Sequence, residues 1–168
     1  MTIRYALKSD SSAAERLRFE ARQDGEQAAK FARPSEVDFD VLQRDALAVM
    51  ARHCGETAAG RAAGAPVQFR YRDGGEYVDD WARGSQIFIS GYMEGYLNAA
   101  LEVAGRNLPI HSIPIMVFGV SGVLRRSAGK FTAVIRLGEN KQPYTARAAS
   151  AVDAISDVAF HLSTRESR

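Results

Sequence analysis

The first part of the chain changes from a strand-like to a helix-like pattern of apolar positions. Residues 2–8 alternate apolar and more polar side chains, and this period of two predicts a short strand. Ser12 is followed three residues later by Glu15, a capping-box pattern that predicts a helix from near Ala13. The helix is expected to end before Pro34, because proline lacks an amide hydrogen and disfavours helical geometry in the preceding residue. Its sparse apolar residues indicate a helix that is mostly solvated or that packs against a partner.

A second helix is predicted to begin at Ser35, in the segment Ser35-Glu-Val-Asp38. Apolar residues then recur every three or four positions, as on one buried helical face. They are Val41, Leu42, Ala46, Val49 and Met50. The pattern stops at Gly55. Residues 55–66 are rich in Gly and Ala without periodicity, so they indicate a loop or flexible connection and the best candidate for an internal boundary.

The middle of the chain predicts a hairpin and then a third helix. Residues 67–72 alternate apolar and polar side chains, and 77–81 can return as the partner strand after a Gly-rich turn. Residues 85–104 place their apolar side chains on one helical face. Gly91 and Gly95 lie inside this helix. Glycines four apart either allow another helix to approach closely or merely loosen the helix, at about 1 kcal/mol each.

The last third of the chain has the most regular pattern. Apolar or alternating residues predict three strands, over residues 114–120, 130–137 and 143–149. Residues 122–129, between the first two strands, combine glycines with arginines and indicate a basic loop. Ser150 and Asp153 then form a capping box before a helix with one apolar face.

These elements together predict an α+β protein. It has N-terminal helices and a C-terminal three-stranded antiparallel sheet packed on helices. The Gly- and Ala-rich connection divides it into an N-terminal helical segment, 1–66, and an α+β domain, 67–168, unless the two form one continuous domain.

Residues 91–164 resemble the double-stranded RNA-binding domain in the order of their elements. The first helix would be GYMEGYLNAALEVAGR, the strands PIMVFGVSG, KFTAVIRL and PYTARAA, and the last helix SAVDAISDVAFHL. The resemblance implies a sheet packed on two helices, with duplex contacts from the loop between the first two strands and from the start of the last helix. Arg125, Arg126 and Lys130 provide a basic loop, whereas the helix start at Ser150 lacks the lysines of the family.

Composition narrows the class of protein. The chain has 168 residues, of which 46% are hydrophobic and 25% charged, as is usual in soluble globular proteins. No apolar run approaches the roughly 20 residues of a membrane helix, and the N-terminus has no signal-peptide pattern, so a cytoplasmic protein without membrane partners is expected. Cys54 is the only cysteine, which excludes an internal disulfide. Its neighbour His53 and the other histidines show no metal-ligand spacing, and neither a metal nor a cofactor is expected.

The net charge of +2 is unevenly distributed along the chain. Residues 107–168 hold 8 Lys/Arg and 4 Asp/Glu, whereas the preceding residues have a slight excess of acids. A polyanion would therefore be attracted first to the C-terminal part. Six cations of this part are the candidate nucleic-acid-binding residues. Arg125, Arg126 and Lys130 are on the predicted loop and its edge, and Arg136, Lys141 and Arg147 are on the two following strands. Alternation places Lys130 and Arg136 on the solvent side of their strand. The alternative is a charged face that only keeps the protein soluble.

Three other patterns in the sequence bear on chemistry. The segment 122–130 ends in Gly-Lys like a phosphate-binding loop, but the spacing is six rather than four, and Phe131 replaces the required hydroxyl. The G-x-x-G at 119–122 follows a strand, whereas the nucleic-acid-binding loop of a KH domain joins two helices. Four acids could ligate a divalent cation or form a solvated turn. They are Asp73, Glu76, Asp79 and Asp80.

The leading hypothesis is a small non-enzymatic protein that contacts nucleic acid through a C-terminal basic face. The alternative is a protein-interaction module, such as an inhibitor or adaptor, that could also self-associate. The sparse N-terminal helix and the glycine-spaced helix favour this alternative, because without a partner neither would have anything to pack against. An enzyme acting through the acids of residues 73–80 is the weakest hypothesis, because the sequence offers no matching base, nucleophile or pocket.

Overall fold

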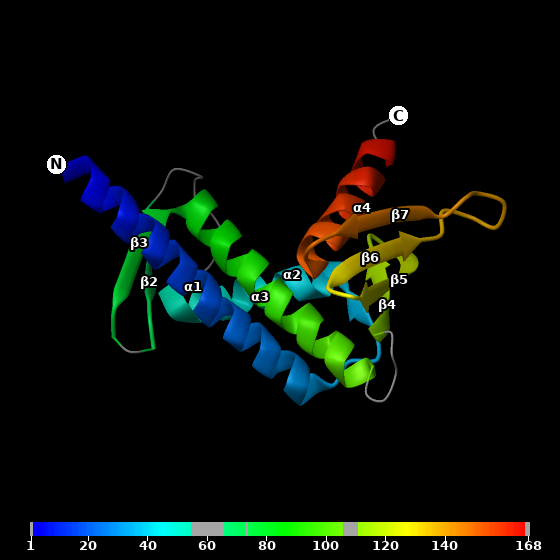
Figure 1. Ribbon diagram of the computed structural model, residues 1–168, viewed down its shortest axis with the longest axis horizontal. Helices are drawn as coiled ribbons and strands as arrows, with labels where there is room; N and C mark the ends of the chain where they lie inside the picture. The colour runs from blue at the N-terminus through cyan, green and yellow to red at the C-terminus, as the bar shows by residue number, and fades with distance from the viewer. Residues whose placement is uncertain (1, 55–65, 73, 106–110, 167–168) are drawn as a thin grey trace.

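The computed structural model describes residues 2–54, 66–72, 74–105 and 111–166. This part of the chain forms four helices and seven strands. In chain order they are α1 (Thr2–Ala32), β1 (Val37–Asp38), α2 (Phe39–Cys54), β2 (Pro66–Arg70), β3 (Glu76–Asp80), α3 (Trp81–Ala104), β4 (His111–Val117), β5 (Val120–Ser127), β6 (Lys130–Ile135), β7 (Tyr144–Ala148) and α4 (Ala151–Glu166). Figure 1 shows α1, α2 and α3 packed together, with the β2–β3 hairpin at one end and the larger sheet with α4 at the other.

The chain begins with one long helix, so the predicted strand over residues 2–8 is wrong. A strand needs a neighbour to satisfy its backbone N–H and C=O groups, whereas a helix satisfies them internally. No proline precedes Pro34, so nothing interrupts α1, and the capping box at Ser12 lies inside it. The predicted end is confirmed: α1 stops at Ala32, and Arg33 adopts a positive φ of 47°.

Close packing of α1 against α3 depends on three glycines: Gly25, Gly91 and Gly95. A Cβ atom at Gly25 would lie 1.9 Å from the carbonyl oxygen of Tyr92, and one at Gly95 would lie 1.9 Å from that of Arg22. Both contacts are with backbone atoms, which cannot move aside as a side chain can. Of the two interpretations of the glycine pair in α3, close helix approach is the one confirmed, and α1 is the approaching helix.

The second helix begins at Phe39 rather than at the predicted Ser35. Asp38 is its N-cap, because Oδ1 accepts hydrogen bonds from the amides of Asp40 (2.9 Å) and Val41 (3.2 Å). Three residues of the predicted apolar stripe are buried: Leu42, Ala46 and Met50. Val41 is instead 43% exposed, so the buried face is narrower than the sequence pattern suggests.

The predicted hairpin and third helix are confirmed. β2 and β3 pair antiparallel. Asp80 explains why α3 starts at Trp81, ahead of the predicted 85: its Oδ1 accepts from the amides of Ala82 (2.7 Å) and Arg83 (3.2 Å). Phe69 of β2 is fully buried, and its ring stacks on Phe88 of α3 with centroids 6.3 Å apart. The hairpin is thereby packed onto the helices.

The basic loop predicted over residues 122–129 is wrong, because β5 occupies most of it. β4, β5, β6 and β7 pair antiparallel in sequence order, and β1 adds parallel to β4. The C-terminal sheet therefore has four antiparallel strands rather than three. Two-residue turns join β4 to β5 and β5 to β6, and their residues have positive φ, as in type I′ turns. These are Phe118 (48°), Gly119 (76°), Ala128 (49°) and Gly129 (73°).

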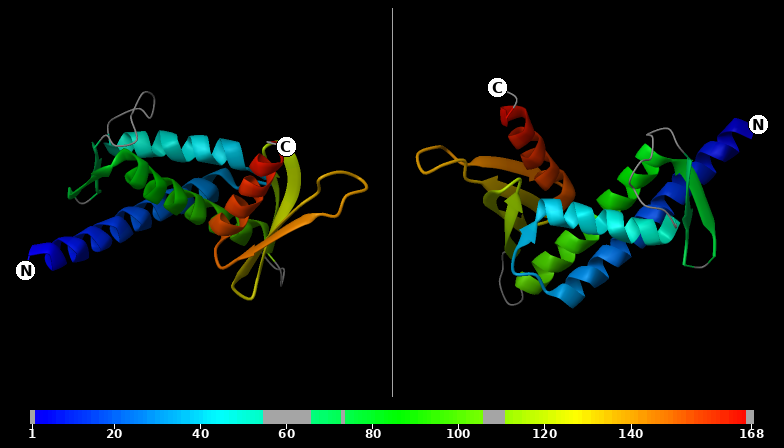
Figure 2. Two further views of the ribbon diagram at one scale, coloured as in Figure 1. Left: turned by 90° about the horizontal axis from the view of Figure 1, so that it is seen from above. Right: turned by 180° about the vertical axis from the view of Figure 1, so that it is seen from behind.

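The helices cover one face of this five-stranded sheet (Figure 2). One row of register partners across the four antiparallel strands is buried against them: Ile113, Leu124, Ala133 and Ala146. The predicted start of α4 is confirmed, because the amide of Asp153 donates to Oγ of Ser150 at 3.1 Å. The α4 residues that pack here are Ile155, Val158 and Leu162. The predicted α+β class is thus confirmed, with the corrected number of strands.

The predicted boundary after residue 66 falls between elements that pack together. α1 and α2 precede it, α3 follows it, and both earlier helices contact α3. The predicted loop at 55–66 lies outside the described residues except for Pro66, which begins β2. Among the helices of the described segments, none is long and apolar enough to cross a membrane.

Candidate functional site

One face of the five-stranded sheet is turned away from the helices, and we call it the open face (Figure 2). Arg125 of β5 lies opposite Thr132 of β6, which in turn lies opposite Arg147 of β7. Side chains alternate between the two sides of a strand. These three residues therefore point away from the buried row next to them, and the two arginines flank Thr132 on the open face.

Two further cations continue this pattern along β6. Lys130 is two residues from Thr132 and lies opposite Ser127. Arg136 follows the strand, and its amide still donates to the carbonyl of Ser121 at 3.4 Å, so it continues the alternation. The predicted solvent exposure of Lys130 and Arg136 is confirmed.

The four cations of the open face are spread widely over it. Arg125 and Arg147 stand two strand spacings apart, or about 10 Å. Lys130 and Arg136 are six residues apart on one extended segment, or about 20 Å. All four are exposed, so their charged groups need not leave the solvent or break other contacts before they bind a ligand.

The positive charge of the open face is not neutralised by acids on its own strands or by ion pairs within the described segments. Strands β4 to β7 contain no Asp or Glu. Within the described segments, none of the four cations has an ion-pair partner at 4.0 Å or less. Next to the arginine row, Val123 and Val134 are register partners and are half-buried. The face thus combines unpaired cations with a shallow apolar strip.

Two of the six predicted residues lie elsewhere. Arg126 points to the helix-covered side of the sheet, because it neighbours Arg125 on a strand and not on a loop. Its guanidinium lies 3.8 Å from the carboxylate of Glu102 in α3, and Nη2 lies 3.5 Å from Nδ1 of His111. Lys141 lies in the segment between β6 and β7, where it lines a separate groove. The structure therefore brings four of the six cations together.

The acids of the predicted turn have local structural roles. Asp80 caps α3, as described above. Asp79 accepts a hydrogen bond from the hydroxyl of Tyr77 and forms an ion pair with Arg83 at 3.4 Å. Glu76 is exposed and accepts a hydrogen bond from the side chain of Gln68. Asp73 lies outside the described residues.

A polar cluster between α1, α2 and β2 was not found from the sequence. Asp24 Oδ2 lies 2.7 Å from Nε2 of His53, and Oδ1 pairs with Arg72, which follows β2. The side chains of Asp24 and His53 are only 13% and 15% exposed. Glu20, one turn earlier in α1, is 8% exposed and has an unpartnered buried Oε2. The signal was present: Glu20 and Asp24 are four residues apart in a helix whose buried side chains otherwise include Leu17, Ala21 and Ala29.

This cluster is better placed to join elements than to transfer protons. Both ring nitrogens of His53 have partners, because Nδ1 lies 3.4 Å from the carbonyl oxygen of Arg70. A cavity of about 320 Å³ beside the cluster is also lined by Tyr92. Burial, and then the charge of Asp45, raises the pKa of Tyr92, so its phenol stays protonated at neutral pH. In this arrangement neither ring offers an available base to a ligand in the cavity.

The described segments offer the open face as a surface for electrostatic binding and no comparable metal centre. No group of three or more His, Cys, Asp or Glu residues in these segments could hold a metal ion. Cys54 is half-buried at the end of α2. Four unpaired cations on a sheet face can attract phosphate groups. No family model matches the chain, and no curated protein and no solved structure matches it either.

Proposed function

We propose that this protein binds nucleic acid through the open face of its sheet. The observation that carries the proposal is the register, which gathers Arg125, Lys130, Arg136 and Arg147 on the one sheet face that no helix covers. Nucleic acids are the polyanions whose regularly spaced phosphates match cations spread over such a distance. Phosphate contacts of this kind release counterions and depend strongly on salt.

The proposed contacts are with the backbone and not with the bases. Arginine and lysine bind phosphate oxygens without reading sequence. No aromatic residue lies among the open-face positions of β4 to β7, so bases have no ring to stack on there. Binding is therefore expected to show similar affinity for different sequences of one strand type.

The resemblance to the double-stranded RNA-binding domain stays a prediction, with a changed mode of contact. The segment expected to protrude as a basic loop is strand β5, and only a two-residue turn separates β4 from β5. The proposal therefore assigns the contact to the sheet face. Comparing duplex and single-stranded ligands identifies the preferred one.

A protein-interaction module is the second candidate, but the features that suggested it have partners inside the molecule. α1 packs along α3, and the glycines of α3 lie against α1 itself. The open face has no comparable internal partner among the described elements. Nucleic acid is therefore the better supported ligand.

Fluorescence anisotropy with labelled duplex RNA, duplex DNA and single strands tests the proposal. The variant Arg125→Ala/Arg147→Ala removes two cations from the open face. We expect weaker binding to every sequence, and a slope of log K against log salt that is smaller by about 1.8 for duplex DNA or about 1.4 for single strands.

The variant Arg126→Ala/Arg52→Ala is the matched control. It removes the same charge, but Arg126 lies on the helix side of the sheet and Arg52 near the far end of α2. We expect its salt slope to equal that of the unmodified protein. No binding at low salt, or equal losses in the two double variants, would overturn the proposal.

A further inference from the structure

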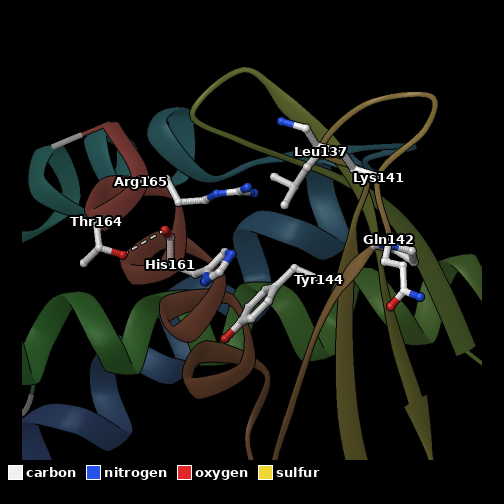
Figure 3. Close-up of a pocket in the computed structure, with 8 residues that line it drawn as sticks. Leu137, Lys141, Gln142, Tyr144, His161, Thr164 and Arg165 are labelled. Carbon is white, nitrogen blue, oxygen red and sulfur yellow. Dashed lines mark hydrogen bonds between the residues drawn. The ribbon is translucent and has the colours of Figure 1, made fainter. Parts of the chain in front are cut away.

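A second candidate binding site lies away from the open face, in a groove between α4 and the segment that joins β6 to β7. The groove has a volume of about 740 Å³, within the range of small-molecule sites. Its lining includes Leu137, Lys141, Tyr144, His161, Thr164 and Arg165. Figure 3 shows these side chains arranged around it, some from α4 and the others from the β6–β7 side.

Two stacked rings form part of the groove wall. The rings of Tyr144 and His161 are nearly parallel, with an interplanar angle of 3° and centroids 3.7 Å apart. The Tyr144 hydroxyl donates to Oδ1 of Asp157 at 2.8 Å, and this bond raises the pKa of Tyr144. Both rings are half-buried, so each keeps some surface for a ligand. With Leu137 beside them, they offer an apolar and partly aromatic surface.

The groove is also positively charged. Arg165 extends from α4 toward Leu137, and Lys141 enters from the opposite side (Figure 3). The described lining contains no carboxylate, and the nearby Asp157 is engaged by Tyr144. A cation in the last turn of a helix interacts favourably with the carbonyl groups at that end, and this effect alone explains the position of Arg165. It does not explain the position of Lys141, which comes from a separate segment.

We propose that this groove binds a nucleoside monophosphate unit. The ring surface and Leu137 would pack against the base or sugar, and Lys141 with Arg165 would bind the phosphate, for which arginine offers paired donors. The unit could be a free nucleotide or part of an oligonucleotide. The groove shares no residue with the open face, so the proposal goes beyond the function proposed for that face and stands without it.

Isothermal titration calorimetry tests the proposal with four ligands. They are adenosine monophosphate, adenosine, inorganic phosphate and a short oligoadenylate. We expect the nucleotide unit, free or in the oligonucleotide, to bind at least about tenfold more tightly than adenosine or phosphate, because only the unit uses both parts of the groove. Binding of the free nucleotide would identify it as the source. Binding of the oligonucleotide alone would identify a strand.

Variants separate the groove from the open face. Lys141 lies in an exposed segment outside the helices and strands, so the Lys141→Ala variant should fold normally. We expect Lys141→Ala, and also Lys141→Ala/Arg165→Ala, to weaken nucleotide binding by about tenfold or more. Arg125→Ala/Arg147→Ala should leave binding of the free nucleotide unchanged. The proposal is overturned if neither source binds, if phosphate alone binds as tightly as the nucleotide, or if the Lys141 variants bind as the unmodified protein does.

Discussion

The carboxylate of Asp24 lies 2.7 Å from Nε2 of His53 and connects α1 to the end of α2. Its other oxygen pairs with Arg72, so one side chain joins three elements. Replacing Asp24 with alanine leaves a largely buried imidazole without this partner. We expect Asp24→Ala to lower the free energy of unfolding by about 2 kcal/mol, measured by urea denaturation.

Asp45→Ala provides the control for Asp24, because Asp45 is an exposed acid on α2. Its effect should stay within about 0.5 kcal/mol. A double-mutant cycle of Asp24→Ala with His53→Ala should give a coupling energy of about 1 kcal/mol. Additive effects would show that the contact between the two side chains contributes nothing.

The loss of stability caused by each Gly→Ala substitution should depend on which atoms the added methyl group meets. At Gly25 and Gly95 it would meet backbone oxygens of the facing helix, so α1 and α3 must separate. We expect Gly25→Ala and Gly95→Ala each to cost about 3 kcal/mol. At Gly84 the methyl would meet the ring of Phe69, 2.7 Å away, and a ring can shift, so Gly84→Ala should cost about 1 kcal/mol. Equal costs at the three sites, by chemical denaturation, would contradict the close helix approach.

Asp80 should matter as a helix cap. Its Oδ1 accepts hydrogen bonds from two amides at the start of α3. Asp80→Ala should cost about 1 kcal/mol, and Asp80→Asn should restore most of it because asparagine is also a good cap. Glu76→Ala is the control, as Glu76 is exposed on the same hairpin. If asparagine is no better than alanine in urea denaturation, the capping role is refuted.

The sequence predicts the second half of the fold better than the first, because the second half has the clearer local pattern of apolar and polar residues. The antiparallel strand over residues 130–137 shows clean alternation, and its buried residues match the pattern. The strand predicted at 2–8 fails because a few alternating residues do not distinguish an isolated strand from the start of a long helix. The pairing partner that decides this lies elsewhere in the chain.

Strand β5 was missed because glycine and paired arginines are typical of a loop. Gly122 belongs in the strand for a tertiary reason: a Cβ there would lie 2.3 Å from the carbonyl oxygen of Val134. The same error placed Arg125 and Arg126 together, whereas strand alternation puts them on opposite faces. The candidate site was therefore predictable as a set of basic residues, but its geometry required the register.

Burial raises the pKa of Tyr92 and Tyr96 above the ordinary value of 10.0, and the charge of Asp45 adds to the effect. Folding thus favours the protonated phenols. Their contribution to stability is fully present below the ordinary value and is lost as the pH rises through the higher folded-state pKa.

We expect Tyr92→Phe/Tyr96→Phe to lose less stability than the unmodified protein between neutral pH and values above 10.0, because phenylalanine does not ionise. Urea denaturation across this range, with tyrosinate absorbance as a second probe, measures the difference. Parallel stability curves for the two proteins would show that these tyrosines ionise equally in the folded and unfolded states.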